Sequence, residues 1–121
     1  MSKEFMVAVS KSDFKKVNDL LSDGVNINSF DKDGRNALFY SYDSKMTDLL
    51  LDKGANPNVI SDDGHTPLHE AESLDVVLSL LNGGANPNIP GVGGKTPIFK
   101  HTNTDILKAL LEGGADPEVP D

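Results

Sequence analysis

Apolar residues follow a helical spacing that returns every 30 residues. In segment 76–81 they stand at i, i+1, i+4 and i+5, and segment 106–111 repeats this spacing. Such a spacing places apolar side chains on one face of a helix. Leucine pairs with the same step extend the pattern along the chain: Leu20–Leu21, Leu50–Leu51, Leu80–Leu81 and Leu110–Leu111. We therefore predict one amphipathic helix in each of four units, at about 1–30, 31–60, 61–90 and 91–121.

Each unit also carries signals for an earlier helix and for turns. Thr66 and Thr96 each precede a proline, and Asn36 takes the same place in the second unit. Thr and Asn side chains can accept an unpaired N–H at a helix start, and proline fits the first helical position. Glycines suited to positive φ follow the later helices, and Asn-Pro-Asn segments that cannot continue a helix come next: Gly54, Gly84 and Gly114, then 56–58 and 86–88. The predicted order within a unit is turn, helix, helix, turn.

A single unit of this kind cannot bury its apolar face, but stacked neighbours bury a continuous core. The predicted fold is therefore an all-α, elongated α-solenoid that forms one domain over 1–121. Terminal units should be more polar at core positions, since they have one neighbour only. The sequence meets this expectation with Lys16 in the first unit and with Thr104 and Lys108 in the last.

The motifs of the units resemble ankyrin repeats. The third unit reads DGHTPLHEA over 63–71, VV at 76–77, LL at 80–81 and GANPN over 84–88. The fourth reads GKTPI over 94–98 and GADP over 114–117. The resemblance implies the ankyrin fold, with hairpin-like finger loops between helix pairs, and a binding module without catalytic residues or a cofactor.

The units are shorter than standard ankyrin repeats. Their step is 30 residues, whereas an ankyrin repeat has 33. Aligning both ends places the missing residues where the first helix should end, around 42–44, 72–73 and 102–104. We predict first helices of about two turns in these units and a longer one in unit one, which keeps the fuller form over 8–14. The trimmed repeat is similar to small bacterial ankyrin proteins.

The resemblance also implies where a partner binds, because ankyrin repeats use a concave groove lined by the fingers and first helices. The corresponding finger positions are Lys32, Asp33, Arg35, Asp62, Asp63, His65, Val92, Gly93 and Lys95. The corresponding helix positions are Tyr40, Tyr42, Asp43, Glu70, Glu72, Lys100 and His101. Tyr and Arg often anchor interfaces, which draws attention to Arg35 and the tyrosines. Two interpretations of Tyr40 stay open, packing between units two and three or exposure alongside Tyr42.

The charge of the chain favours a basic protein partner. Eleven Lys and Arg stand against 19 Asp and Glu, for a net charge of −8, which repels nucleic acids and anionic lipids. The absence of cysteine excludes disulfides and Cys-ligated zinc. No signal peptide is recognised and no apolar run approaches the ~20 residues of a membrane span. We expect a cytoplasmic protein that is monomeric when free.

Two local patterns suggest a nucleotide site and a metal or acid–base site, and each pattern has a simpler structural interpretation. Segment 91–96 imitates the end of a phosphate-binding loop, but that motif needs a glycine where the chain has Ile89. A glycine-rich finger explains the segment, so we expect no nucleotide site. His65 and His69, with Asp62 and Asp63 nearby, could hold a metal ion or act in acid–base catalysis. We favour a packing role for His69 and solvated finger carboxylates, and we expect neither a metal site nor an enzyme.

Two hypotheses on function follow. In the first, the concave acidic face binds a basic partner, in the most specific form as an immunity or inhibitor protein that neutralises a toxin enzyme. In the second, the chain is a host-directed effector or a scaffold with several partners. A tight, salt-sensitive complex would favour the first, and weaker binding to many proteins would favour the second.

Overall fold

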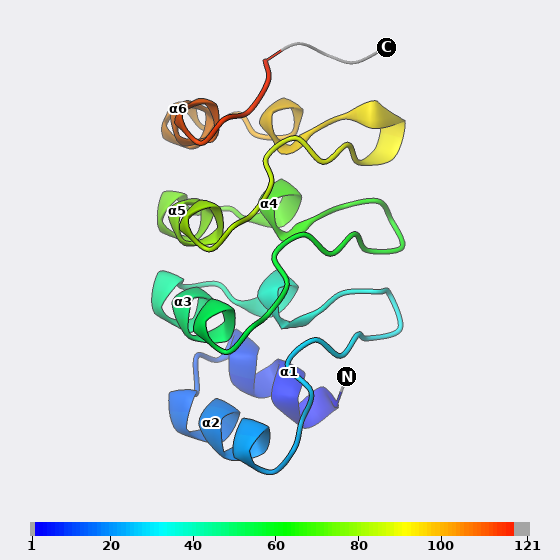
Figure 1. The fold of residues 1–121 in the computed structure, drawn as a ribbon, viewed down its shortest axis with the longest axis vertical. Coiled ribbons are helices and arrows are strands. Elements are labelled where there is room, and N and C mark those ends of the chain that lie inside the picture. Colours follow the sequence, from blue (N-terminus) through cyan, green and yellow to red (C-terminus); the bar gives the residue numbers. More distant parts are fainter. Residues whose placement is uncertain (1, 118–121) are drawn as a thin grey trace.

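The protein is an elongated stack of helix pairs. The computed structural model describes residues 2–117, and α1 (Lys3–Ser10) and α6 (Thr104–Glu112) lie toward opposite ends of the stack (Figure 1). Each unit lies next to its sequence neighbours, and finger-like loops project on the side opposite to the longer helices (Figure 1). The all-α solenoid predicted from the 30-residue step is confirmed, and residues 2–117 contain no strand.

Within the described residues, units one to three each contain two helical segments, and unit four contains three. In unit one they are α1 (Lys3–Ser10) and α2 (Phe14–Ser22). Units two and three contain the 3-10 helix η1 (Ala37–Tyr40) with α3 (Ser44–Asp52), and α4 (Pro67–Glu70) with α5 (Leu74–Asn82). Unit four contains a short turn in its finger, η2 (Val92–Gly94), then η3 (Pro97–Phe99) and α6 (Thr104–Glu112). None of the described helices is long and apolar enough to span a membrane.

The first helices of units two to four are shorter than predicted. We expected about two turns, but η1 and α4 have four residues and η3 has three. The cause lies immediately after each helix. In unit three the backbone becomes extended at Ala71, and Ser73 already caps α5 by accepting a hydrogen bond from the N–H of Val76 at 3.2 Å. The shortened repeat therefore removes one helical turn.

The predicted starts of these short helices are confirmed, with one correction to their capping. The side chain of Asn36 accepts a hydrogen bond from the N–H of Leu38 at 3.2 Å, as expected of a cap. The hydroxyl of Thr96 is buried and has no hydrogen-bond partner within residues 2–117. In unit three a histidine, His69, meets the Thr66 hydroxyl at 2.9 Å. Unit four has Phe99 at that position, which cannot form this bond.

The core runs along the stack between the longer helices. Met46, Leu50, Val77, Leu80 and Leu110 have no exposed surface. The predicted glycines follow the helices in left-handed conformations, with φ of +95°, +100° and +103° at positions 54, 84 and 114. The polar residues predicted for the terminal units, Lys16, Thr104 and Lys108, are exposed.

Three asparagines at the same position of successive units, Asn28, Asn58 and Asn88, each bond to the next unit, and we call them the asparagine ladder. The side-chain amide of Asn58 donates to the carbonyl oxygen of Gly84 at 3.2 Å, and its Oδ1 accepts from the N–H of Asn86 at 2.7 Å. Asn28 and Asn88 make the same pair of bonds, to Gly54 and Asn56 and to Gly114 and Asp116. The ladder fixes the spacing between neighbouring units, and thereby the spacing between their fingers.

Each finger is a short loop closed by a backbone hydrogen bond at its base. The N–H of residue 31 donates to the carbonyl oxygen of 35 at 2.9 Å, 61 to 65 at 2.8 Å and 91 to 95 at 2.6 Å. The first two fingers are also joined, since the N–H of Asp62 donates to the carbonyl oxygen of Asp33 at 2.8 Å. The fingers are therefore defined loops with fixed tips.

Candidate functional site

The predicted partner-binding positions lie along one side of the stack. We call this region the finger surface: the fingers 31–35, 61–65 and 91–95, the helices η1, α4 and η3 (Figure 1), and the residues that follow these helices, 41–43, 71–73 and 100–102. Seven of the predicted finger positions are exposed: Lys32, Asp33, Asp62, Asp63, Val92, Gly93 and Lys95. Arg35 and His65 are half-buried; the side chain of Arg35 contacts unit three, and that of His65 contacts residues of its own unit.

Arg35 connects the finger 31–35 of unit two to unit three. Its Nη2 lies 3.1 Å from Oδ2 of Asp63 and 3.3 Å from Oε2 of Glu70, and its guanidinium sits 5.7 Å from the centre of the Phe39 ring. Burial opposes the charge of Arg35, but the carboxylates of Glu70 and Asp63 outweigh it and raise the pKa of Arg35 above its ordinary value. The predicted anchor Arg35 is thus engaged within the chain.

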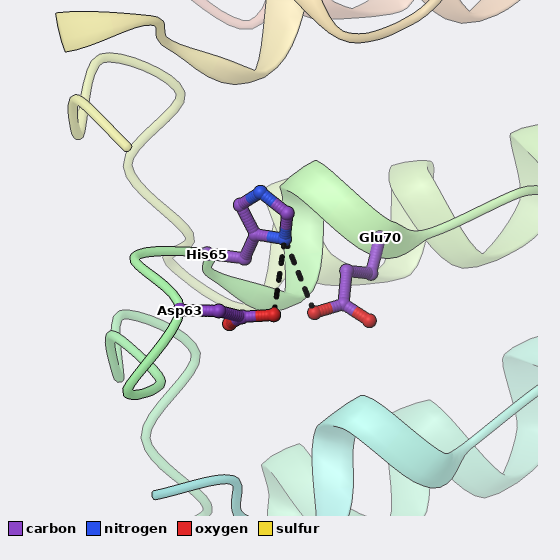
Figure 2. Close-up of side chains that lie close together, drawn as sticks. All are labelled: Asp63, His65 and Glu70. Atoms are coloured by element: carbon purple, nitrogen blue, oxygen red, sulfur yellow. Dashed lines mark ion pairs between the residues drawn. The ribbon is translucent and has the colours of Figure 1, made fainter. Parts of the chain in front are cut away.

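His65 faces the same two carboxylates. Its Nδ1 lies 3.8 Å from Oδ2 of Asp63 and 3.5 Å from Oε2 of Glu70 (Figure 2). A hydrogen bond from the Ser61 hydroxyl, helped by the charges of His65 and Arg35, lowers the pKa of Asp63 below its ordinary value. The donor atoms of Asp63, His65 and Glu70 all lie within 4.8 Å of one another. They form a compact group of one imidazole and two carboxylates.

The neighbouring His69 has a different environment. It is 2% exposed, and its Nε2 lies 2.9 Å from the carbonyl oxygen of Lys95 while its Nδ1 lies 3.0 Å from the N–H nitrogen of Thr66. Burial lowers the pKa of His69 below its ordinary value. The packing role predicted for His69 agrees with these contacts. Its ring also stacks on that of His65, with centroids 5.4 Å apart.

The two tyrosines differ in exposure. Tyr40 is half-buried against the core and its hydroxyl donates a hydrogen bond to Asp31. Burial and this hydrogen bond raise the pKa of Tyr40 to about 12. Tyr42 is 65% exposed. Tyr40 is therefore not exposed alongside Tyr42, and its hydrogen bond lies within unit two; packing between units two and three stays a prediction.

A hollow of about 600 Å³ lies between units two and three at the base of the fingers. Residues of both units line it, among them Arg35, Phe39, Tyr42, Glu70, Glu72 and Val76. Its lining combines one exposed aromatic ring with apolar side chains. It also carries two carboxylates, Glu70 and Glu72, against one guanidinium, Arg35. Such a hollow can receive a side chain or short segment of another molecule, with specificity from the few charged groups at its rim.

The remaining predicted positions have mixed roles. Asp43 is half-buried and caps α3 by accepting from the N–H of Met46 at 2.8 Å, so it supports the helix. Lys100 is exposed and, with His101, lines a second hollow of about 350 Å³ between units three and four. Nε2 of His101 lies 2.7 Å from the carbonyl oxygen of Leu68. This contact joins the last unit to the third.

Arg35, Asp63, His65 and Glu70 were all predicted site positions, but their grouping into one charged network was not predicted. His65 was paired with His69, which stands four residues further along the chain. The structure directs His69 into the stack and brings Glu70 to His65 instead. The 30-residue step places Arg35 one unit before His65, but it does not give the distance between neighbouring units, so it does not locate the cross-unit contact.

Comparison with protein families identifies the repeats. A family model for ankyrin repeats matches residues 5–91 as three copies. No curated protein matches the chain.

Proposed function

We propose that this chain, which belongs to the ankyrin repeat family, binds a basic protein through its finger surface. Ankyrin repeats are protein–protein interaction modules, so a protein partner follows from the family. The basic character of the partner, and the face that binds it, are the parts that we add. In the most specific form of the proposal, the chain is an immunity or inhibitor protein that blocks a toxin enzyme.

The observation that carries the proposal is the environment of Tyr42. This ring is 65% exposed on the rim of the hollow between units two and three, where Glu70 and Glu72 also lie. An exposed aromatic ring next to carboxylates favours a basic side chain, because the ring face and the negative charges both attract a cation. The net charge of −8 would steer such a partner toward the chain.

The first experiment is capture of partners from the lysate of the source cell at low and at high salt, with identification by mass spectrometry. The proposal expects one basic protein that is released when salt is raised, because screening weakens attraction between exposed charges. A toxin enzyme among the captured proteins would support the inhibitor form. Several unrelated partners would instead favour a scaffold.

Variants then test the face. Tyr42→Ala should weaken the captured complex at least about tenfold, as expected of a central aromatic anchor. Asp62→Lys should slow association, since it reverses an exposed charge on a finger tip. Asp48→Lys makes the same charge change at an exposed position of α3 and should have a smaller effect. Equal losses for Asp62→Lys and Asp48→Lys, with no loss for Tyr42→Ala, would contradict binding at the finger surface.

A further inference from the structure

We infer that Asp63, His65 and Glu70 form a binding site for a divalent transition-metal ion of the zinc class. The three residues belong to the finger and the short helix α4 of unit three. Each offers one donor atom, and the three atoms lie within 4.8 Å of one another. Figure 2 shows the imidazole and both carboxylates directed toward a common point.

The donor distances fit a small ion. Around a tetrahedral ion bound at about 2.0–2.2 Å, neighbouring ligand atoms lie roughly 3.3–3.6 Å apart. Nδ1 of His65 lies 3.5 Å from Oε2 of Glu70 and 3.8 Å from Oδ2 of Asp63. The first of these two separations already matches, the second needs a contraction of a few tenths of an ångström, and the third, between the two carboxylate oxygens, is within 4.8 Å. Side-chain rotations can supply the contraction, with the backbone unchanged.

The local structure holds the donors in place. The ring of His65 stacks on His69 with an interplanar angle of 16°, and His69 is itself fixed by Thr66 and by the carbonyl group of Lys95. The finger that carries Asp63 is closed by the hydrogen bond from residue 61 to residue 65 at 2.8 Å. Donors that are already arranged lose little conformational entropy when an ion binds.

One carboxylate oxygen of Glu70 is held by ion pairs with Arg35 and His65, at 3.3 Å and 3.5 Å, and by no hydrogen bond. This oxygen, Oε2, has essentially no solvent-exposed surface. A buried acceptor without a hydrogen bond is unfavourable, and this atom points toward Nδ1 of His65 (Figure 2). An ion bound here would coordinate it directly.

Arg35 already places a positive charge at these oxygens. Its Nη2 contacts Oδ2 of Asp63 at 3.1 Å and Oε2 of Glu70 at 3.3 Å. The contacts show that the two carboxylates together attract a cation, and they make Arg35 a competitor for the same two atoms. An ion must displace the guanidinium, so the presence of Arg35 weakens metal binding.

The donor types select the class of ion. Calcium takes six to eight oxygen ligands and magnesium requires an octahedral oxygen shell, whereas an imidazole with two carboxylates suits zinc and its first-row neighbours. Three protein donors leave one position of a tetrahedral ion for water. We therefore expect zinc and cobalt to bind and magnesium to compete poorly.

The test is a pair of titrations into the free chain in a non-chelating buffer. Binding of Co²⁺ is measured by visible absorption and binding of Zn²⁺ by calorimetry. We expect one ion per chain. His65→Ala and Asp63→Asn should each weaken binding at least about tenfold, the lower end of what losing an outer-shell partner alone costs. The controls His101→Ala and Asp62→Asn make the same changes outside the group and should leave affinity unchanged. Arg35→Gln should strengthen binding several-fold, and circular dichroism checks that each variant is folded.

Three outcomes would each overturn the inference. They are the absence of saturable binding to the folded wild type, an equal loss for Asp62→Asn and Asp63→Asn, and an unchanged affinity in Arg35→Gln. The strengthening in Arg35→Gln is the sharpest outcome, because binding at carboxylates elsewhere on the chain does not predict it. The experiment needs no protein partner, so its result is independent of the proposed protein-binding function.

Discussion

The imidazole of His69 bridges units three and four by a hydrogen bond between its Nε2 and the carbonyl oxygen of Lys95, 2.9 Å away. Its other nitrogen, Nδ1, lies 3.0 Å from the backbone nitrogen of Thr66. A carbonyl oxygen only accepts and an N–H only donates, so the neutral tautomer protonated at Nε2 satisfies both partners. A second proton on Nδ1 would point at the N–H of Thr66.

The first prediction concerns this histidine and pH. Burial lowers the pKa of His69 below its ordinary value of 6.5. Below about pH 6.5 the unfolded chain therefore binds a proton more readily than the folded chain, and stability falls as pH decreases. His69→Phe gives unit three the residue that the adjacent units carry as Phe39 and Phe99. It should lose about 1–3 kcal/mol of the free energy of unfolding at neutral pH by leaving backbone groups unpaired.

Urea unfolding at several pH values checks this prediction. The difference in free energy between wild type and His69→Phe should shrink as pH falls below 6.5, because only the wild type loses the contribution of a neutral His69. Other titrating groups are common to both proteins and cancel in the difference. A difference that stays constant or grows in acid would contradict the assignment.

The second prediction concerns Tyr40 in alkali. The pKa of Tyr40 is raised from 10.0 to about 12 by burial and by the hydrogen bond to Asp31. The chain has two tyrosines, so Tyr42→Phe leaves Tyr40 as the only phenol. Its phenolate absorbance in the folded protein should then rise with a midpoint near 12, and a midpoint near 10 in folded protein would contradict the contact. Because the unfolded chain loses this proton first, stability should fall as pH rises from about 10.

The repeat and its longer helices could be predicted from the sequence. Apolar spacing and the following glycine act within one unit, and they located α3, α5 and α6 without reference to other units. The short first helices were harder. The step of 30 residues shows that each unit lacks three residues of a standard repeat. The spacing does not tell whether the first helix or the turn after it is shortened. Ser73 and Asn103 begin the next helices early, and this removes the turn from the first helix.

The candidate site was predicted only as a set of positions. Arg35 reaches Asp63 across 28 residues of chain, and this contact depends on how far one unit is displaced and rotated relative to the next. The period of the sequence does not contain that information. Tyr40 could not be assigned for a different reason: its partner Asp31 lies in the same unit, and the apolar spacing does not tell how the finger folds back on η1.

The third prediction concerns the asparagine ladder. Asn58→Ala removes both bonds that join units two and three behind the core, to Gly84 and to Asn86. We expect the free energy of unfolding to fall by about 1–3 kcal/mol, the range for two net hydrogen bonds. Asn58→Asp keeps the acceptor oxygen and loses the donor N–H. Its free energy of unfolding should therefore lie between those of the wild type and Asn58→Ala. Denaturant unfolding measures all three, and an unchanged stability in Asn58→Ala would mean that water replaces the ladder.

The fourth prediction concerns salt. The net charge of −8 produces self-repulsion in the folded chain, and salt screens it. The ion pairs Lys15–Asp19 and Lys16–Glu4 are exposed and contribute little that salt could remove. Added sodium chloride should therefore raise the melting temperature by a few degrees, which corresponds to ~1 kcal/mol. A melting temperature that falls with salt would show that attractive pairs such as Arg35–Glu70 dominate.

The last prediction compares two glycines with ordinary backbone angles. A methyl group on Gly91 would lie 2.5 Å from the carbonyl oxygen of Gly64 and 2.9 Å from Nε2 of His69. Neither atom can move freely, since one is backbone and the other is held by Lys95. Gly91→Ala should therefore cost about 1–3 kcal/mol, as overpacking does in a fixed environment.

Gly83→Ala is the matched control. The three atoms nearest to a methyl group there all belong to the side chain of Leu51, the first a terminal carbon at 2.5 Å. Leu51 is half-buried, so that its side chain can turn away. Thermal unfolding should place Gly83→Ala closer to wild type than Gly91→Ala. The reverse order would mean that the second and third fingers are not held against His69 as the structure describes. Agreement would identify the contact between Gly91 and His69 as the constraint that fixes the fingers of units three and four relative to each other.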